Sequence, residues 1–288
     1  MRWLLIGFIW MGFSMEAKVL IITHSYNRPD FIEIQYKTFQ KFFQDPYEYL
    51  VFNDAPEEGA AARIEEMCAQ FGIECVRIPQ SIHTQPYLPR DPQDDLQNPA
   101  VRCANVVQYS LDTKGFDHDG PVLIVDADLF LIREFSLAAQ LKGYDLGGVW
   151  QKRDRFLYLW NGLVLLDMHT LPDKRTLNFN CTKIEGISLD VGGATYHYLQ
   201  AHPDLRCLSI ETLFFKTWDF LSDRQRQHPH VTWLFEEHPT EIEFLWDYTF
   251  LHYRSGTNWN HKDAAYHQAK TAILNRYIEK ILSAVAVE

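Results

Sequence analysis

Positive charge is scarce in this chain of 288 residues. Lysine and arginine together number 27, against 38 aspartates and glutamates, which gives a formal net charge of -11 at pH 7. Proteins that bind nucleic acid usually carry a basic patch or stripe, so this composition argues against nucleic acid as a partner. An anionic substrate would instead need a bound metal ion or a few well-placed cations.

Cysteine is also sparse, and its pattern does not identify a redox compartment. The cysteines are odd in number and lack the paired, close spacing of zinc sites. At most two disulfides can form among them, which leaves the compartment open. The residues are Cys68, Cys75, Cys103, Cys181 and Cys207.

A hydrophobic run long enough to span a membrane comfortably is lacking at the N-terminus. The run from 3 to 13 is too short, but with Arg2 before it the segment 1–17 resembles a signal peptide or anchor. Its cleavage site is imperfect, because Met15 stands where a small residue is preferred. Alternatively, Met15 is the true start. The first interpretation predicts a membrane-associated or exported protein, and the second a cytoplasmic one.

Repeats, linkers and low-complexity segments are absent from the rest of the chain. Hydrophobic residues make up 47% of the sequence, which is enough for a substantial core. We therefore expect residues 18–288 to form a single domain.

Short apolar runs alternate with amphipathic stretches in the first half of the chain. We expect strands at 18–23, 47–52, 73–78 and 122–125, and helices at 30–43, 60–71 and 100–111. This alternation predicts an α/β fold with a mainly parallel, Rossmann-related sheet and helices on both faces. Asp30 and Glu33 have the spacing of a capping box for the first helix, and Gly72 suits the end of the second.

The remaining pattern is less regular. Residues 79–99 contain five prolines and fit neither period, so we expect a long loop there. Further helices are expected at 136–141, 194–200 and 264–285. Further strands are expected at 146–150, after Asn161 and Gly162 in the segment 156–167, and at 205–210 and 249–254.

Two aspartates follow the apolar strand 122–125. Asp126 and Asp128 fall at its carboxyl end, where open α/β sheets place their ligands. Carboxylates separated by one residue can share a hard divalent cation, and that cation can hold a diphosphate. An isolated pair of this kind is more often a strand end with two solvated acids, and Asp128 can alternatively cap a helix. The interpretation therefore depends on the rest of the chain.

Six segments share their order and spacing with a known family. They are THSYNRPDFI, FNDAP, VRCAN, IVDADLF, WNGLVLLD and LHYRSGTNW. Together they resemble the GT-A fold glycosyltransferases, which move a sugar from a nucleotide-activated donor, and the resemblance covers most of the chain after Lys18. It implies a GT-A-like glycosyltransferase domain over 18–288. The implied reaction is metal-dependent transfer from a nucleotide-diphosphate sugar to a hydroxyl of a glycan, lipid or protein acceptor.

The same resemblance implies a metal site. Carried onto this sequence, it gives Asp126, Asp128 and His252 as ligands of Mn²⁺ or Mg²⁺, with Asp126 also serving the diphosphate. Two carboxylates and a neutral imidazole are a reasonable ligand set for Mn²⁺. Lys262 follows His252 and can neutralise the leaving diphosphate.

A nucleotide site is implied near the ends of the first two strands. Asp54 resembles the acid that contacts the base or ribose, and a carboxylate that accepts from an imide N–H weakly favours a uridine-type donor. The alternative is an Asx turn with Asn53. Asn27 and Arg28 can frame the nucleotide, although Arg28 can equally be an ordinary surface cation.

Arg102 and Asn105 lie one helical turn apart, and thus on one face of the expected helix 100–111. There Arg102 can contact phosphate or orient Asp126, although most helical arginines do neither.

An acceptor side is expected in the second half of the chain. Asp190 is the candidate base for an acceptor hydroxyl; alternatively, it caps the helix 194–200. Trp160, Asn161 and Gly162 can line this side because aromatic faces stack on sugars, or Trp160 can belong to the core.

Two other functions are compatible with parts of the pattern. An apolar strand followed by Asp-x-Asp also opens haloacid dehalogenase-like phosphatases, but there it lies near the start of the domain, whereas more than a hundred residues precede it here. A non-catalytic relative that binds nucleotide sugars is the other alternative, because the match around Asp190 is imperfect.

Overall fold

A computed structural model describes residues 18–84, 98–214, 221–232, 243–258 and 264–284. Its strands are β1 Val19–Ser25, β2 Tyr47–Asn53, β3 Glu74–Arg77, β4 Pro121–Val125, β5 Leu129–Leu131, β6 Leu146–Arg153, β7 Phe156–Asp167, β8 Thr182–Ile184, β9 Ile187–Leu189, β10 Cys207–Ser209, β11 Thr212–Phe214, β12 Glu243–Leu245 and β13 Phe250–His252. Its helices are α1 Pro29–Phe42, α2 Glu58–Phe71, α3 Ser81–Thr84, α4 Pro99–Ser110, α5 Leu137–Leu141, α6 Thr195–Ala201, α7 Asp223–Arg226 and α9 Ala264–Ser283. The described residues also include a π-helical turn, η1 Leu111–Gly115, and the 3-10 turns η2 Lys174–Thr176 and η4 Gly256–Asn258.

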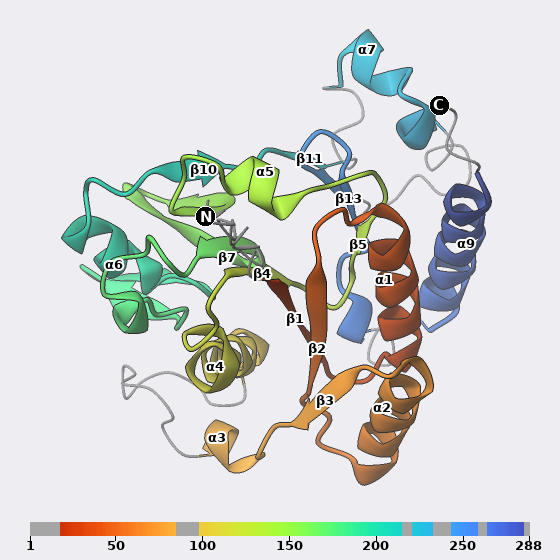
Figure 1. Cartoon of the computed structure of the whole chain (residues 1–288), viewed down its shortest axis with the longest axis horizontal. Coiled ribbons are helices and arrows are strands. Elements are labelled where there is room, and N and C mark those ends of the chain that lie inside the picture. Colours follow the sequence, from red (N-terminus) through yellow and green to blue (C-terminus); the bar gives the residue numbers. More distant parts are fainter. Residues whose placement is uncertain (1–17, 85–97, 215–220, 233–242, 259–263, 285–288) are drawn as a thin grey trace, which may run out of the picture.

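A seven-stranded sheet with the order β10-β6-β7-β4-β1-β2-β3 forms the centre of the molecule (Figure 1). Four of its neighbouring pairs are parallel, and only β7 runs antiparallel to both of its neighbours. The predicted α/β class with a mainly parallel sheet is therefore confirmed.

Helices cover both faces of this sheet, as the sequence predicts. Along β1, Val19 and Ile21 join one core cluster, which includes residues of α1, α2 and α5. Leu20 and Ile22 join the other, which includes residues of α4 and α6. Alternate residues of one strand are thus buried on opposite faces, which explains why the strand reads as a continuous apolar run.

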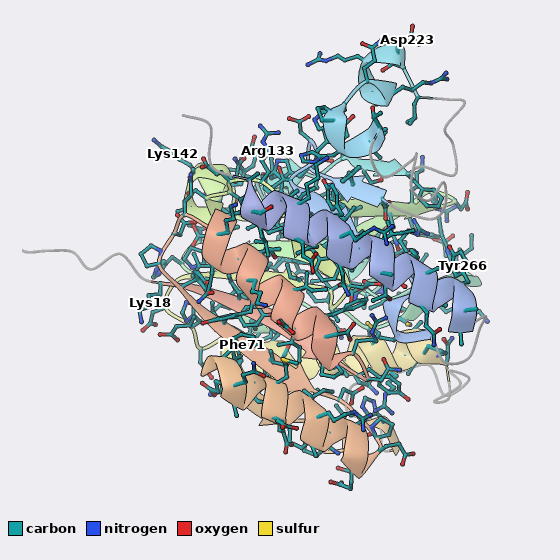
Figure 2. All side chains as sticks on the ribbon, turned by 90° about the vertical axis from the view of Figure 1, so that its right-hand side faces the viewer. Lys18, Phe71, Arg133, Lys142, Asp223 and Tyr266 are labelled. Carbon is teal, nitrogen blue, oxygen red and sulfur yellow. The ribbon has the colours of Figure 1, made fainter. Side chains whose placement is uncertain are left out.

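A second, four-stranded sheet in the order β11-β12-β13-β5 adjoins the first one. All of its pairs are antiparallel. It shares a third core cluster with α1 and α9, and Figure 2 shows α9, α1 and α2 side by side over that side of the molecule. The sequence did not predict this sheet, because its strands are only three residues long.

Two local expectations need correction. Helix α1 begins at Pro29 with Arg28 as its N-cap and without a side-chain cap, so the predicted capping box of Asp30 and Glu33 is wrong. Proline fits the first helical position because its missing N–H has no partner there. The expected loop 79–99 contains the short helix α3, and most of what remains of it lies outside the described residues.

The ends of the other predicted helices agree closely. Gly72 ends α2 in the left-handed conformation, with φ 67°, as expected of a C-cap glycine. Among the helices that the structure describes, none is long and apolar enough to cross a membrane, and the segment 1–17 lies outside this part of the chain.

Candidate metal centre

The turn that carries the two aspartates lies where the chain passes from the large sheet to the small one. After β4, the Asp126 N–H donates to the carbonyl of Gly162 at 2.8 Å, and β5 begins three residues later. Asp128 precedes a strand rather than a helix, so the alternative that it caps a following helix is wrong. The turn therefore connects β4 of the large sheet directly to β5 of the small sheet.

A buried glutamine of α1 holds the backbone of this turn by hydrogen bonds. Gln35 of α1, only 1% exposed, donates from Nε2 to the carbonyls of Asp126 at 2.8 Å and Leu129 at 2.7 Å. Its own Oε1 accepts from the hydroxyl of Tyr49 at 2.5 Å. Both Nε2 hydrogens and the Oε1 atom of this amide are thus engaged, which holds the backbone of the turn in place.

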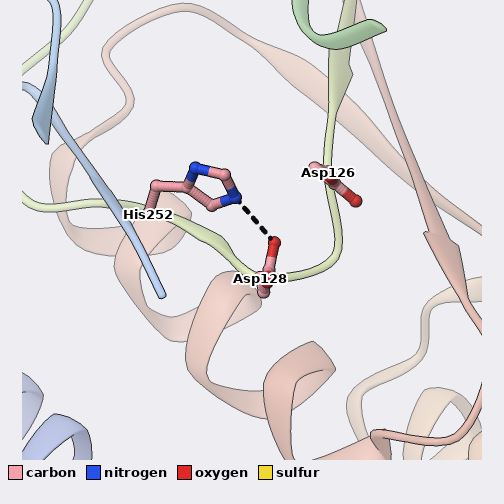
Figure 3. A group of neighbouring side chains, drawn as sticks. All are labelled: Asp126, Asp128 and His252. Atoms are coloured by element: carbon pink, nitrogen blue, oxygen red, sulfur yellow. Dashed lines mark ion pairs between the residues drawn. The ribbon is translucent and has the colours of Figure 1, made fainter. Parts of the chain in front are cut away.

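Asp126, Asp128 and His252 come together at this turn (Figure 3). One ligand atom from each residue lies within 4.8 Å of the others. His252 Nε2 is 3.2 Å from Asp128 Oδ1, and both side chains are almost fully buried. The pairing of β13 with β5 brings them together, because His252 stands opposite Leu129 in that register.

Further groups surround these three side chains. Glu243 of β12 places Oε2 at 2.8 Å from His252 Nδ1, and the Gly256 N–H donates to Asp128 Oδ2 at 2.9 Å. The ring of Trp160 lies 5.3 Å from the imidazole, centre to centre. A metal-binding histidine usually has such a carboxylate on its other nitrogen.

The charges of Asp126, Asp128 and His252 shift one another's pKa values. Burial, with the neighbouring carboxylate of Asp128, raises the pKa of Asp126 to about 6. Burial would also raise the pKa of Asp128, but the adjacent His252 and the Gly256 N–H outweigh it and lower that pKa. Burial opposes the charged imidazole, yet the carboxylates of Asp128 and Glu243 prevail and raise the pKa of His252. The centre is thus a concentrated negative site with one balancing cation.

This arrangement fits a divalent cation. The three side chains open onto a cavity of about 250 Å³, which is also lined by Arg254 and Thr257. Carboxylates and imidazole suit Mn²⁺, and carboxylates alone suit Mg²⁺. A cation there would compensate the negative charge of Asp128, which together with burial raises the pKa of Asp126.

Asp54 lies in a second polar cluster, at the end of β2. Its Oδ1 is 2.7 Å from His83 Nε2, and its Oδ2 accepts from Arg102 Nε at 2.8 Å. Arg102 also donates to Gln80 Oε1 at 2.7 Å, and its guanidinium lies 5.0 Å from the ring of Tyr26. Arg102 is thus directed to Asp54 rather than to Asp126, and both oxygens of Asp54 have a side-chain partner.

The neighbours of Asp54 complete this cluster. Asn53 Oδ1 accepts from the Ala55 N–H at 3.1 Å, so the Asx turn considered for this strand end is made by Asn53. Asn105 Nδ2 lies 3.2 Å from His83 Nδ1, on the same helix face as Arg102. A nucleotide-binding role for this cluster stays a prediction.

Arg28 is 6% exposed, so the alternative of an ordinary surface cation is wrong. Its guanidinium donates to both carboxylate oxygens of Asp30, at 2.9 and 2.6 Å, and to the carbonyl of Gly256 at 3.2 Å. Asn27 Nδ2 donates to the carbonyl of Thr257 at 2.9 Å. These residues therefore hold the segment that lines the metal cavity, and contact with a nucleotide stays a prediction.

Asp190 lies apart from the residues that line this cavity. Its Oδ1 accepts from the Val191 N–H at 2.8 Å, and its Oδ2 is 3.8 Å from an Arg153 nitrogen. Helix α6 has Ala194 as its N-cap and no side-chain cap, so the helix-capping alternative is wrong. The side chain is 44% exposed, and its role as a base stays a prediction.

The three candidate acceptor residues belong to β7. Trp160 packs against the core beside His252, while Asn161 Nδ2 donates to Cys103 Sγ at 3.2 Å. A Cβ on Gly162 would lie 2.1 Å from the Trp160 ring, so only glycine allows the ring to rest there. Lys262 lies outside the described residues.

The residues of these two clusters that sequence reasoning missed include Gln35, His83 and Glu243. Gln35 had a signal, since it is polar within the apolar stripe of its helix. Glu243 and His83 had none, because their partners are set by the pairing of distant segments.

Comparison with known proteins gives a coarse match only. No protein-family profile matches the sequence, and no curated protein matches it. The chain is similar to mannosyltransferase PcManGT from Pyrobaculum calidifontis, solved with GDP-Man and Mn²⁺, at 14% identity and a TM-score of 0.43. That alignment covers 68% of this chain and 55% of the mannosyltransferase chain, so it spans little more than half of that protein.

A second similar structure is glucosyl-3-phosphoglycerate synthase from Mycobacterium tuberculosis, solved with Mn²⁺, UDP and glucosyl-3-phosphoglycerate. It is 12% identical with a TM-score of 0.39, over 67% of this chain and 69% of that chain. Similarity at this level leaves the activity of the chain to be inferred from its own residues.

Proposed function

We propose that this protein is a metal-dependent glycosyltransferase that uses a nucleotide-diphosphate sugar as donor. The observation that supports it is the convergence of Asp126, Asp128 and His252 at the carboxyl edge of a mainly parallel sheet. Ligands of open α/β sheets bind at that edge. An acidic surface with net charge -11 would otherwise repel a diphosphate, and a cation at this point removes that obstacle.

The proposed roles follow from position. Asp126, Asp128 and His252 hold Mn²⁺ or Mg²⁺, which when bound stabilises negative charge on the departing diphosphate. Arg254 opens onto the same cavity and supplies a cation beside the metal. The Asp54 cluster, with Arg102 and the loop of Asn27 and Arg28, surrounds the nucleoside.

The donor base is an open part of this proposal. The sequence weakly favours a uridine-type donor because the Asp54 carboxylate can accept from an imide N–H. That reason weakens here, since His83 and Arg102 already contact its two oxygens. Arg102, whose side chain is 25% exposed, is the cation of this cluster that can meet acceptor atoms of a base or phosphate.

Turnover of a nucleotide-sugar panel tests this function. The 18–288 chain would be incubated with UDP-, GDP- and CMP-sugars, with and without Mn²⁺, and nucleotide release would be measured. We expect metal-dependent release from one donor, lost in Asp128→Asn while the protein stays folded. Binding of one donor without release would support the non-catalytic relative instead. Release of inorganic phosphate from phosphomonoesters, with no binding of any donor, would support the phosphatase.

A further inference from the structure

Glu243 shares one carboxylate between a metal ligand and a cation of the metal cavity. Its Oε2 is 2.8 Å from His252 Nδ1 and 3.3 Å from an Arg254 guanidinium nitrogen. The Glu243 side chain is 12% exposed, and the guanidinium rests 4.0 Å above the ring of Phe214. Strand pairing maintains this contact, because Glu243 stands opposite His252 in the β12–β13 ladder.

The position of this carboxylate determines which imidazole nitrogen is available to a metal. Carboxylates face both ring nitrogens, but Nε2 lies on the side of Asp128 and the cavity, so a metal ion bound there would replace the proton on Nε2 and leave the ring hydrogen on Nδ1, where Glu243 can only accept it. The lone pair then lies on Nε2, the nitrogen that is 3.2 Å from Asp128 Oδ1. We propose that Glu243 is the positioning residue of the metal centre: it sets the tautomer and orientation of His252 and holds Arg254 at the cavity. This inference rests on the proposed metal-dependent function and adds a residue to its site.

Metal affinity in a double-mutant cycle tests the proposal without reference to catalysis. Mn²⁺ dissociation constants would be measured on the 18–288 chain by electron paramagnetic resonance for wild type, Glu243→Ala, His252→Ala and the double variant. Loss of a carboxylate behind a metal-binding histidine typically costs about 10–100-fold in affinity, and we expect a loss of that size for Glu243→Ala. Because Glu243 acts through the imidazole, the double variant should bind no more weakly than His252→Ala alone.

Two further variants separate positioning from general loosening of the small sheet. Glu243→Gln keeps an oxygen that accepts from Nδ1, so it should retain more affinity than Glu243→Ala. Asp247→Asn removes a carboxylate that pairs with Arg133 at the other end of the same hairpin, and it should leave Mn²⁺ binding unchanged. Glu243→Ala should also reduce the preference for Mn²⁺ over Mg²⁺, because imidazole favours Mn²⁺.

The outcomes are distinguishable from failure of the proposed function. If Glu243→Ala weakens Mn²⁺ binding equally with and without His252, Glu243 supports the fold rather than the imidazole, and the inference is overturned. If Glu243→Ala binds Mn²⁺ as tightly as the wild-type protein does, and the wild-type protein turns over a nucleotide sugar, the inference about Glu243 is overturned while the proposed function stands. A wild-type protein that binds no Mn²⁺ overturns both.

Discussion

Among the three proposed ligands, Asp126 is the carboxyl group whose charged form is destabilised by folding. Its carboxylate is packed beside that of Asp128, and the pair is balanced by His252 alone among the three proposed ligands. Between the ordinary carboxyl pKa of about 4 and the folded-state value of about 6, the folded protein binds more protons than the unfolded chain. Stability therefore falls as pH rises through this interval, and the full cost is present above it.

We accordingly expect Asp126→Asn to stabilise the metal-free protein at pH 8 by about 1–2 kcal/mol while weakening Mn²⁺ binding. The amide oxygen can still accept from the Ala127 N–H, so local geometry is kept. Urea denaturation in EDTA at pH 8 and pH 4.5 measures this, and the gain should shrink at the lower pH. A variant less stable than wild type at pH 8 would contradict the prediction. Added Mn²⁺ should stabilise the wild-type protein only.

Sequence reasoning identifies the three proposed ligands of this centre but not the residues that contact and orient them. Asp126 and Asp128 can be singled out because they follow a buried strand, and His252 because it ends a late apolar run. Glu243 cannot be singled out in this way. Its contact with His252 depends on the pairing register of β12 and β13, two three-residue strands that are joined by a turn. Side chains that act on other side chains leave little trace in one sequence.

At the scale of elements, Arg28 connects three segments that are distant in the chain. From the start of α1 its guanidinium reaches Asp30, the carbonyl of Gly256 and, at 3.2 Å, the hydroxyl of Thr271 on α9. Phe31 lies beneath it, with 3.6 Å from the guanidinium carbon to the ring centre. A lysine has no planar fork to make these contacts together.

Arg28→Lys should therefore destabilise the protein by about 1–3 kcal/mol, because hydrogen bonds of a charged group are lost where the residue is buried. Arg63→Lys provides the matched control, since Arg63 is exposed on the neighbouring helix α2. Denaturation midpoints of the two variants measure the difference. Equal midpoints would show that the connection contributes nothing.

An ion pair fastens the edge strand β10 to the rest of the large sheet. Asp145, just before β6, accepts from Arg206 Nε at 3.1 Å and from the Arg206 N–H at 2.9 Å. The guanidinium, followed by that backbone N–H, holds the pKa of Asp145 down to about 2 against a smaller opposing effect of burial. The contribution to stability is present above the unfolded pKa of about 4 and is lost as pH falls to about 2.

Asp145→Asn should thus lower the thermal midpoint at pH 7 and make little difference near pH 2. Thermal unfolding followed by circular dichroism across this range measures the effect. The magnitude should be modest and should fall in high salt, because Arg206 is half exposed. A pH-independent difference would point to lost packing instead.

The errors of sequence reasoning at this scale have local causes. Asp30 and Glu33 have the spacing of a capping box, but Pro29 takes the first helical position and the N-cap is Arg28, two residues before Asp30. The centre of the large sheet was predictable because β1, β2 and β4 are runs of mostly buried residues. The small sheet was not, since strands this short give no detectable period.

At the scale of the whole molecule, α9 covers the core that the small sheet shares with α1. Its buried residues include Leu274, Tyr277 and Ile278, which belong to the same cluster as Phe31 and Leu251. The last described helix thus packs against elements from both the start and the later part of the chain.

Leu274→Ala should cost about 2–4 kcal/mol of stability, because it leaves a cavity in this cluster. Asn275→Ala, one position along on the exposed side of the helix, should cost far less. Urea denaturation of both variants measures the contrast. Similar losses would mean that α9 is only loosely packed.

The division of the metal centre between two sheets has a kinetic consequence. Asp128 follows β4, the central strand of the large sheet, whereas His252 lies more than 120 residues later on a strand of the small sheet. Contacts between such distant segments form late in folding. The three proposed ligands should therefore not yet be together in the transition state of folding, so Mn²⁺ should bind only after it. It should leave the refolding rate almost unchanged and slow the unfolding rate, so that the ion prolongs the lifetime of the native protein.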